Sequence, residues 1–254
     1  MATPAQMLEE ELVKRPANAM VVAGIGVSLA TCRNDPTATW KGLLLHGLRR
    51  CADVCGSDET TLSAYRQLVD GPATPTHALI TVGEFITNEL KKRRAGLYGA
   101  WLSDSLGSIR AVDLRLVRAL ASLGVSLATT NYDSMIEAGT GAAPILWRNQ
   151  AIAHNFFCDG HEGILHIHGH FSDPDSIILG SGSYNEICRD EFAIHALQSQ
   201  LFRGTIVFVG CGAGLADPNL GSLLEWSRTV LANSHRSHFI LVRTGDIQFW
   251  HDQL

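Results

Sequence analysis

The chain has 254 residues, of which 46% are hydrophobic and 18% are charged. This composition is typical of a folded core and not of a disordered chain. The length suits one large domain, or a domain that carries an inserted module. The net charge of −5 at pH 7 excludes the fold-wide positive field of a nucleic-acid-binding protein, so we expect no direct binding of nucleic acid.

Export or membrane insertion is not predicted. Residues 1–15 are acidic and have no long apolar run, which argues against a signal peptide. No segment approaches the roughly 20 apolar residues of a membrane-spanning helix. The six cysteines form no CxxC pair, so we interpret them as buried or half-buried free thiols of a cytoplasmic protein, not as zinc ligands. They are Cys32, Cys51, Cys55, Cys158, Cys188 and Cys211.

The N-terminal half predicts one strand followed by helices. The apolar run AMVVA at residues 19–23 is a buried strand that leads into GIGVS, and a polar loop is predicted up to Trp40. Residues 40–55 have the apolar stripe of a helix. From there on the pattern is helical, and the basic run KKRR at 91–94 is interpreted as the solvated end of a helix. We therefore predict an all-helical module at residues 57–123.

The C-terminal half alternates strands with helices. Strands are predicted at GVSLATT, GILHIHG, SIIL, TIVFVG and HFILVRT. Helices are clearest at residues 188–204 and 217–233. This alternation is typical of a parallel sheet covered on both faces. The prediction is an α/β fold with a doubly wound, Rossmann-like parallel sheet at residues 1–56 and 124–254, into which the helical module is inserted.

Ligands of doubly wound sheets bind beyond the carboxyl ends of the strands. The first strand is followed there by Gly24 and Gly26, which would let the backbone approach a phosphate, and by Ser28, which offers a hydroxyl. A tight turn without a ligand is the alternative. Leu29 stands at the third glycine position of the dinucleotide fingerprint, which disfavours a dehydrogenase.

Polar or glycine-rich segments also follow two later strands. In TTNYD, the alternative to a ligand site is that Asn131 or Asp133 caps the helix that starts at SMIEA. In GCGAGLADPN, Gly210 and Gly212 allow close backbone approach, whereas Asp217 before Pro218 has the pattern of a helix N-cap.

Three histidines alternate in HIHGH, and on a strand they would share one face. A metal site, core histidines and a single catalytic base are the three interpretations. His168 stands before Gly169, where the strand breaks into a loop, so it is the best placed to meet a ligand. We expect His166 to be a hydrogen-bonded core residue and His170 to lie at the rim. No metal is predicted.

Together, and in this order, the four segments resemble the sirtuin superfamily, in its zinc-free branch of sirtuin-like NAD-consuming domains. GIGVS resembles the GAGxS phosphate loop of that family, and TTNYD resembles its TQNxD box. HIHG resembles the strand that ends in His-Gly, and VGCGAGLADPN the late glycine-rich ribose loop.

The resemblance implies an NAD pocket between the sheet and the helical module. Asn131 would hold the attacking water beside the nicotinamide ribose, His168 would be the general base, and Asp133 would face the nicotinamide carboxamide. Gly24, Gly26 and Ser28 would hold the pyrophosphate, while Gly210 and Gly212 would flank the adenosine ribose. Ala23, Thr130 and Tyr132 complete the residues implied to contact NAD.

The chain also departs from the family pattern. The zinc ribbon of the protein deacylases is missing, and Arg33 has no adjoining phenylalanine in the loop after GIGVS. Cys211 and Gly212 stand where the ribose loop usually has a hydroxyl-bearing pair. The departures thus concern the loop after GIGVS and the ribose loop of the implied pocket.

The expected activity is hydrolysis of NAD+ to nicotinamide and ADP-ribose. Nicotinamide is already a cationic leaving group, so the protein has only to orient the ribose, stabilise an oxocarbenium-like transition state and activate water. The resemblance implies a toxic, NAD-depleting effector of anti-phage immunity, restrained by self-association or by a regulatory partner. The alternatives are a non-catalytic scaffold that binds NAD or ADP-ribose and oligomerises, and an NAD-dependent protein deacylase.

Overall fold

Twelve α-helices, five short 3-10 helices and six strands are present in the described part of the chain. The computed structural model describes residues 2–72, 74–159, 162–232, 237–248 and 250. The strands are β1 (Ala19–Ala23), β2 (Ser126–Thr129), β3 (Pro144–Leu146), β4 (Ile164–His166), β5 (Thr205–Val209) and β6 (Phe239–Leu241). The helices are α1 (Pro4–Lys14), α2 (Ile25–Cys32), α3 (Trp40–Cys55), α4 (Glu59–Asp70), α5 (Thr76–Arg93), α6 (Leu97–Ser105), α7 (Arg115–Ala121), α8 (Met135–Thr140), α9 (Gln150–Asp159), α10 (Ser181–Ile187), α11 (Glu191–Arg203) and α12 (Pro218–Val230).

The six strands form one parallel sheet in the order β3-β4-β2-β1-β5-β6. The first strand is central; β2, β3 and β4 lie on one side of it, with β3 at the edge, and β5 and β6 lie on the other. The order therefore reverses at β1, which makes its carboxyl end the switch point where doubly wound sheets bind ligands. The predicted α/β class and Rossmann-like topology are confirmed.

Alternate residues of the central strand serve two separate cores. Met20 and Val22 pack with residues of β4, β5, α11 and α12 on one face of the sheet. Val21 and Ala23 pack on the opposite face with residues of α2, α7 and α8. All five residues of β1 are buried, as expected for a strand covered by helices on both faces.

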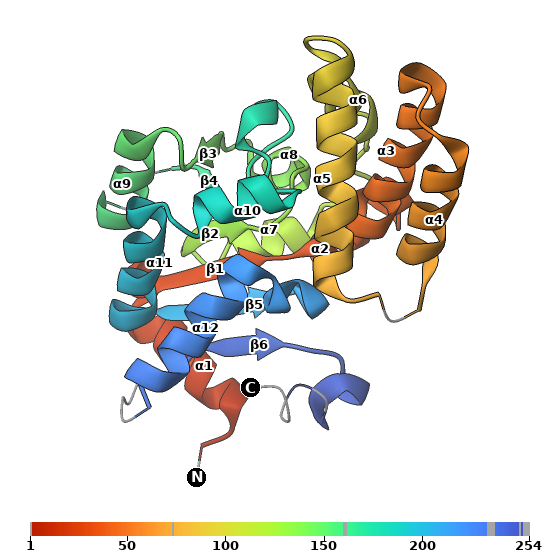
Figure 1. The fold of residues 1–254 in the computed structure, drawn as a ribbon. Helices are drawn as coiled ribbons and strands as arrows, with labels where there is room; N and C mark the ends of the chain where they lie inside the picture. Colours follow the sequence, from red (N-terminus) through yellow and green to blue (C-terminus); the bar gives the residue numbers. More distant parts are fainter. Residues whose placement is uncertain (1, 73, 160–161, 233–236, 249, 251–254) are drawn as a thin grey trace.

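A third core belongs to the helical module. It joins α3, α4, α5 and α6, and its largest fully buried side chain is Trp101. In Figure 1 these helices stand together on the side toward which the arrow of β6 points. Since the sheet is parallel, the carboxyl ends of the strands face the module.

The packing moves both limits of the predicted module. Leu43, Leu44 and Leu48 of α3 lie in the module core, although the sequence pattern grouped this helix with the sheet. Val117 of α7 packs against the sheet, although residues 57–123 were predicted as one unit. The packing thus favours a module that runs from α3 to α6.

The strand predictions were right for the apolar runs of β1 and β5 and wrong in two places. Residues 176–179 form no strand. The backbone N–H of Ile178 donates to His168 O at 2.9 Å, in the loop after β4, and not to a strand of the sheet. Conversely, β3 was missed, since it has only three residues and begins with Pro144. The predicted polar loop before Trp40 also proved partly helical, because α2 continues to Cys32.

The remaining expectations concern the surface. The basic residues Lys91, Lys92 and Arg93 end α5 and are exposed, as predicted. All six cysteines are free, but Cys158 and Cys188 are exposed, which corrects the expectation of burial. Among the described residues, no helix combines the length and the apolar character needed to cross a membrane.

Candidate active site

A cavity of about 620 Å³ lies at the carboxyl edge of the sheet, between the sheet and the helical module. Its size is within the range of small-molecule sites. Segments that follow four different strands and the start of α3 meet in it. Among its lining residues are Ile25, Trp40, Thr130, Asn131, Tyr132, His168, Cys211 and Asp217. The predicted residues Thr130, Asn131, Tyr132 and His168 are therefore brought together.

The loop between β2 and α8 holds Asn131 in place through its backbone and its side chain. The Asn131 N–H donates to Thr129 Oγ1 at 3.0 Å, and its side-chain amide donates to Ser28 Oγ at 2.8 Å. Tyr132 is tied to the far wall, because its hydroxyl donates to Ile178 O at 2.6 Å. Asn131 is 8% exposed, so a small part of it remains open to the cavity.

The hydroxyl of Ser28 contacts the loop between β2 and α8, which we call the asparagine loop, and Ser28 is not among the residues that line the cavity. It is fully buried at the fourth position of α2, and its hydroxyl donates to Asp133 Oδ1 at 3.0 Å. The resemblance had implied a pyrophosphate contact for this hydroxyl. The structure places it behind Asn131 instead, since this turn of the helix faces the loop after β2.

Asp133 is buried just before the start of α8, whose N-cap is Ser134. Its Oδ1 accepts from the backbone N–H of Met135 at 3.0 Å as well as from Ser28. Burial raises the pKa of this carboxyl. The expected N-cap role is wrong in its position, because Ser134 is the N-cap of α8 and Asp133 stands one residue before it. A contact of Asp133 with a carboxamide stays a prediction, and the residue is 3% exposed.

The glycines of the first loop allow two loops to touch. A Cβ on Gly24 would collide with the Cα atom of Cys211, and one on Gly26 would lie 2.9 Å from Gly210 Cα. The N–H groups of Gly24 and Gly26 donate to the carbonyls of Val209 and Gly210, at 2.9 and 2.8 Å. These two amides thus have partners within the protein, and a contact of Gly24 or Gly26 with the pyrophosphate stays a prediction.

The remaining residues implied to contact NAD lie outside the cavity lining. Ala23 is buried within β1. Gly210 directly follows β5 and has a φ of +68°, a conformation that glycine adopts easily, and Gly212 is exposed with a φ of +50°. Ligand contacts of these three residues stay predictions.

His168 and Asp217 form a buried pair in the cavity wall. His168 Nε2 lies 3.7 Å from Asp217 Oδ1. Asp217 caps α12 as predicted, since Oδ1 accepts from the N–H groups of Asn219 and Leu220. His168 Nε2 and Asp217 Oδ2 are buried and have no hydrogen-bond partner. Unsatisfied buried polar atoms are costly, so these two atoms point to donors and acceptors supplied by a ligand.

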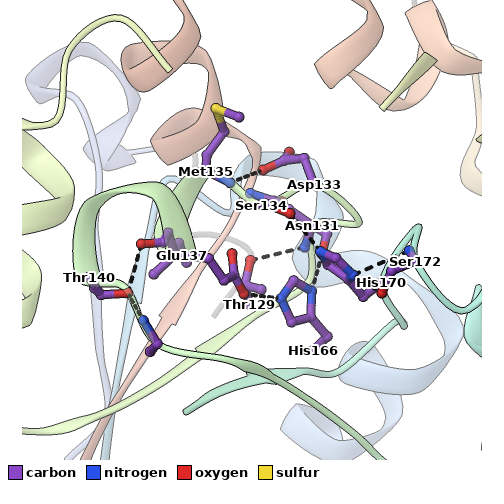
Figure 2. Close-up of polar contacts among 12 residues, drawn as sticks. Thr129, Asn131, Asp133, Ser134, Met135, Glu137, Thr140, His166, His170 and Ser172 are labelled. Atoms are coloured by element: carbon purple, nitrogen blue, oxygen red, sulfur yellow. Dashed lines mark hydrogen bonds and ion pairs between the residues drawn. The ribbon is translucent and has the colours of Figure 1, made fainter. Parts of the chain in front are cut away.

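The three histidines do not share one face, because β4 ends at His166 and the chain turns after it. His166 contacts Asn131 O through Nδ1 at 2.9 Å and Glu137 Oε1 through Nε2 at 2.6 Å. His170 is buried beside it, with the two ring centroids 4.7 Å apart, which corrects the expected rim position. Burial lowers the pKa of His170 to about 4. Figure 2 shows the rings of His166 and His170 beside Asn131.

Sequence reasoning missed Glu137 entirely. It lies on α8, 29 residues before its partner His166. The contact arises only because β4 lies next to β2 in the sheet, so no local pattern signals it.

A larger cavity of about 790 Å³ lies at the opposite, amino edge of the sheet, with Asn18, Ser126 and Gly163 among its lining residues. It contains none of the polar residues that follow the strands. The amino-edge cavity is the larger of the two, but the carboxyl-edge cavity has buried atoms of His168 and Asp217 that a ligand would satisfy. The carboxyl-edge cavity is therefore the candidate active site.

Comparison with known proteins identifies the family. A model of the SIR2-like domain matches residues 125–253, just over half of the chain. The chain belongs to the SIR2-like family. The match includes the loops that carry Asn131, His168 and Asp217, whereas the first glycine loop and the helical module precede it.

This SIR2-like chain is similar in sequence to a curated protein, the NAD(+) hydrolase ThsA of Enterococcus faecium. The two are 26% identical over 196 residues, which is 71% of this chain and 40% of that protein. The chain thus spans less than half of the length of this relative.

Proposed function

We propose that this chain cleaves the nicotinamide–ribose bond of NAD+ in the carboxyl-edge cavity and releases nicotinamide and ADP-ribose. The observation that carries the proposal is the unpartnered pair of His168 Nε2 and Asp217 Oδ2, buried in the wall of a cavity that Asn131 also lines. Membership of the SIR2-like family and similarity to a protein named as an NAD(+) hydrolase support the choice of NAD+.

The site supplies what this reaction needs. The leaving group is cationic, so no strong acid is required, and the ribose carbon that loses it develops positive charge. His168 accepts the proton of the attacking water or of a ribose hydroxyl. The Asn131 amide, fixed by Ser28, orients the water. The Asp217 carboxylate, 3.7 Å from His168, stabilises the imidazolium that forms and accepts a hydrogen bond from the ribose.

The test is incubation of the purified protein with NAD+, followed by chromatography of the products. Equal amounts of nicotinamide and ADP-ribose are expected. Binding of NAD+ without turnover would favour the scaffold alternative, and release of nicotinamide only in the presence of an acetylated peptide would favour the deacylase. A depletion of cellular NAD+ that limits phage growth is the biological setting we propose, on the basis of the family resemblance.

The pH dependence follows from His168. Burial lowers the pKa of this imidazole, and the charge of Asp217 opposes that shift. A lowered pKa keeps the base neutral below its ordinary value of about 6.5. We expect kcat/KM to stay constant as the pH falls through 6.5 and to decline only at more acidic pH, because this ratio reports the free enzyme.

Asp217→Asn should move that decline to still lower pH, since it removes the charge that raises the pKa of His168. Asparagine also caps helices well, so α12 should persist. Asp246→Asn, at an exposed carboxylate, is the control and should leave the profile unchanged. A decline of the Asp217→Asn variant at higher pH than the wild type would contradict the assignment of His168 as the base.

A further inference from the structure

Glu137, His166 and His170 form a polar group next to Asn131, and its shortest contact joins His166 to Glu137. His166 is fully buried, and Glu137 is 11% exposed at its side chain. Dashed lines in Figure 2 join the ring of His166 to Glu137 on one side and to Asn131 on the other. Glu137 forms its hydrogen bond with His166 and not with the proposed base His168, so the reaction itself does not explain its function.

The proton count of this group is fixed by its partners. A carbonyl oxygen only accepts, so His166 Nδ1, 2.9 Å from Asn131 O, must carry a proton. Nε2 of a neutral ring would then be an acceptor, and it faces Glu137 Oε1, another acceptor, at 2.6 Å. A contact this short requires a second proton between them. In addition to the Nδ1 proton, Nε2 and Glu137 Oε1 therefore share one proton, which sits either on the ring or on the carboxyl. The pair is neutral overall in both cases.

The consequence of this proton lies in the Asn131 backbone. While Glu137 occupies the Nε2 side, the ring has only one way to satisfy Nδ1, which is to donate to Asn131 O. Without Glu137 the proton of a neutral ring could move to Nε2, and two acceptors would then face each other at Asn131. The carbonyl would lose its partner in a buried position, at a cost that favours movement of the loop.

A second contact braces the same loop. Burial keeps His170 neutral by lowering its pKa to about 4. Its Nδ1 accepts from the Ser172 N–H at 3.3 Å, so Nε2 carries the proton and donates to Ser134 Oγ at 2.8 Å. His166 at the end of β4 and His170 in the loop after it thus contact the asparagine loop on both sides of Asp133, which suits a rigid, preorganised site.

A metal ion is the alternative explanation of the cluster. Glu137, His166 and His170 offer ligand atoms that lie within 4.8 Å of one another. The ring nitrogens that would bind the ion already have protein partners at 2.6 to 2.9 Å. An ion would have to displace the Glu137 and Ser134 contacts, so shared protons explain the geometry better.

We propose that Glu137 is a positioning residue: it holds a proton on the Nε2 side of His166, and His166 thereby fixes the carbonyl of Asn131 and the direction of the Asn131 amide. This inference rests on the proposed NAD+ hydrolysis. It predicts an effect on kcat with little effect on KM, because Asn131 is proposed to orient the water and not to bind the dinucleotide.

The experiment compares Glu137→Gln with Glu137→Met. Glutamine can donate from its amide to Nε2 and keeps the Nδ1 proton on Asn131, so kcat should stay within about 5-fold of the wild type. Methionine can do neither, and kcat should fall about 10- to 100-fold, as for a small displacement of a reacting group, with KM within about 3-fold. Glu89→Gln is the control, because Glu89 accepts a hydrogen bond from Ser57 inside the helical module.

Histidine-selective ¹⁵N NMR supplies a second measurement that does not depend on turnover. In the wild type, both ring nitrogens of His166 should couple to protons or to a shared proton, and in Glu137→Gln only Nδ1 should be protonated. This measurement remains decisive if Glu137→Met proves too unstable to purify.

The outcomes separate the two proposals. No turnover by the wild type and by Glu89→Gln would overturn the proposed function, and the positioning role in that reaction with it. Wild-type kcat in Glu137→Met, or a wild-type His166 ring that carries no proton on Nδ1, would overturn only the positioning role. A zinc ion that co-purifies with the wild type and is lost in Glu137→Gln would also overturn it, in favour of the metal site.

Discussion

Replacement of His168 by alanine is expected to lower kcat for NAD+ hydrolysis by about 10²- to 10⁴-fold, the usual contribution of a general base. His168 Nε2 has no hydrogen-bond partner in the protein, so the substitution breaks no bond at that atom. The imidazole lies in the wall of an existing cavity, and its removal enlarges that cavity. We therefore expect a large kinetic effect with a small change in thermal stability.

The measurement is steady-state release of nicotinamide, with the thermal midpoint recorded for the same preparation. His195→Ala is the matched control, because His195 is exposed on α11. Turnover of His168→Ala within a factor of three of this control would show that another group accepts the proton.

Replacement of Asn131 by alanine is expected to lower kcat by about 10²-fold, the usual cost of losing one fixed polar group at a reacting centre. The side-chain amide donates to Ser28 Oγ, and Ser28 in turn donates to Asp133. Truncation removes the first of these bonds and keeps the second, so the buried carboxyl remains satisfied. The loss should consequently appear in kcat and not in folding.

Asn88→Ala is the control for this variant, since Asn88 is an exposed residue of α5 whose amide also donates to a side chain, that of Glu84. Both variants should unfold at similar temperatures, while only Asn131→Ala loses activity. Equal activity of the two would remove Asn131 from the reaction.

Much of the sheet could be predicted from sequence because its central strands are continuous apolar runs. Residues 19–23 and 205–209 are buried on both faces and match β1 and β5. Short edge elements carry less information, which is why β3 at Pro144–Leu146 was missed. Ile178 has strand composition but lies in an extended loop, because its partners are the loop after β4 and the Tyr132 hydroxyl.

The candidate site was predictable only in part. The placement of Asn131 and His168 at one cavity could be predicted, because each follows a strand whose carboxyl end lies at the same edge of the sheet. The contact of the Ser28 hydroxyl with Asp133 could not be predicted, since the direction of a side chain on the first turns of α2 depends on how that helix packs. The contact of Glu137 with His166 joins α8 to β4 and depends on strand order, which no short sequence pattern reveals.

The helical module also shows the limits of periodicity. Amphipathic stripes identified α3 and α5 as helices but not the core to which they belong. Gly47 of α3 packs against Ile86 and Trp101, and this close fit ties α3 to the module. One wall of the cavity, including Trp40, therefore belongs to a part of the chain that the sequence pattern assigned to the sheet.

The measurement that tests the central claim most directly is a crystal structure of the Asn131→Ala variant grown with NAD+. The account predicts that the nicotinamide ribose lies in the carboxyl-edge cavity, with a hydroxyl near His168 Nε2 and a hydrogen bond to Asp217 Oδ2. NAD+ bound instead in the larger cavity at the amino edge, beside Asn18 and Ser126, would contradict it.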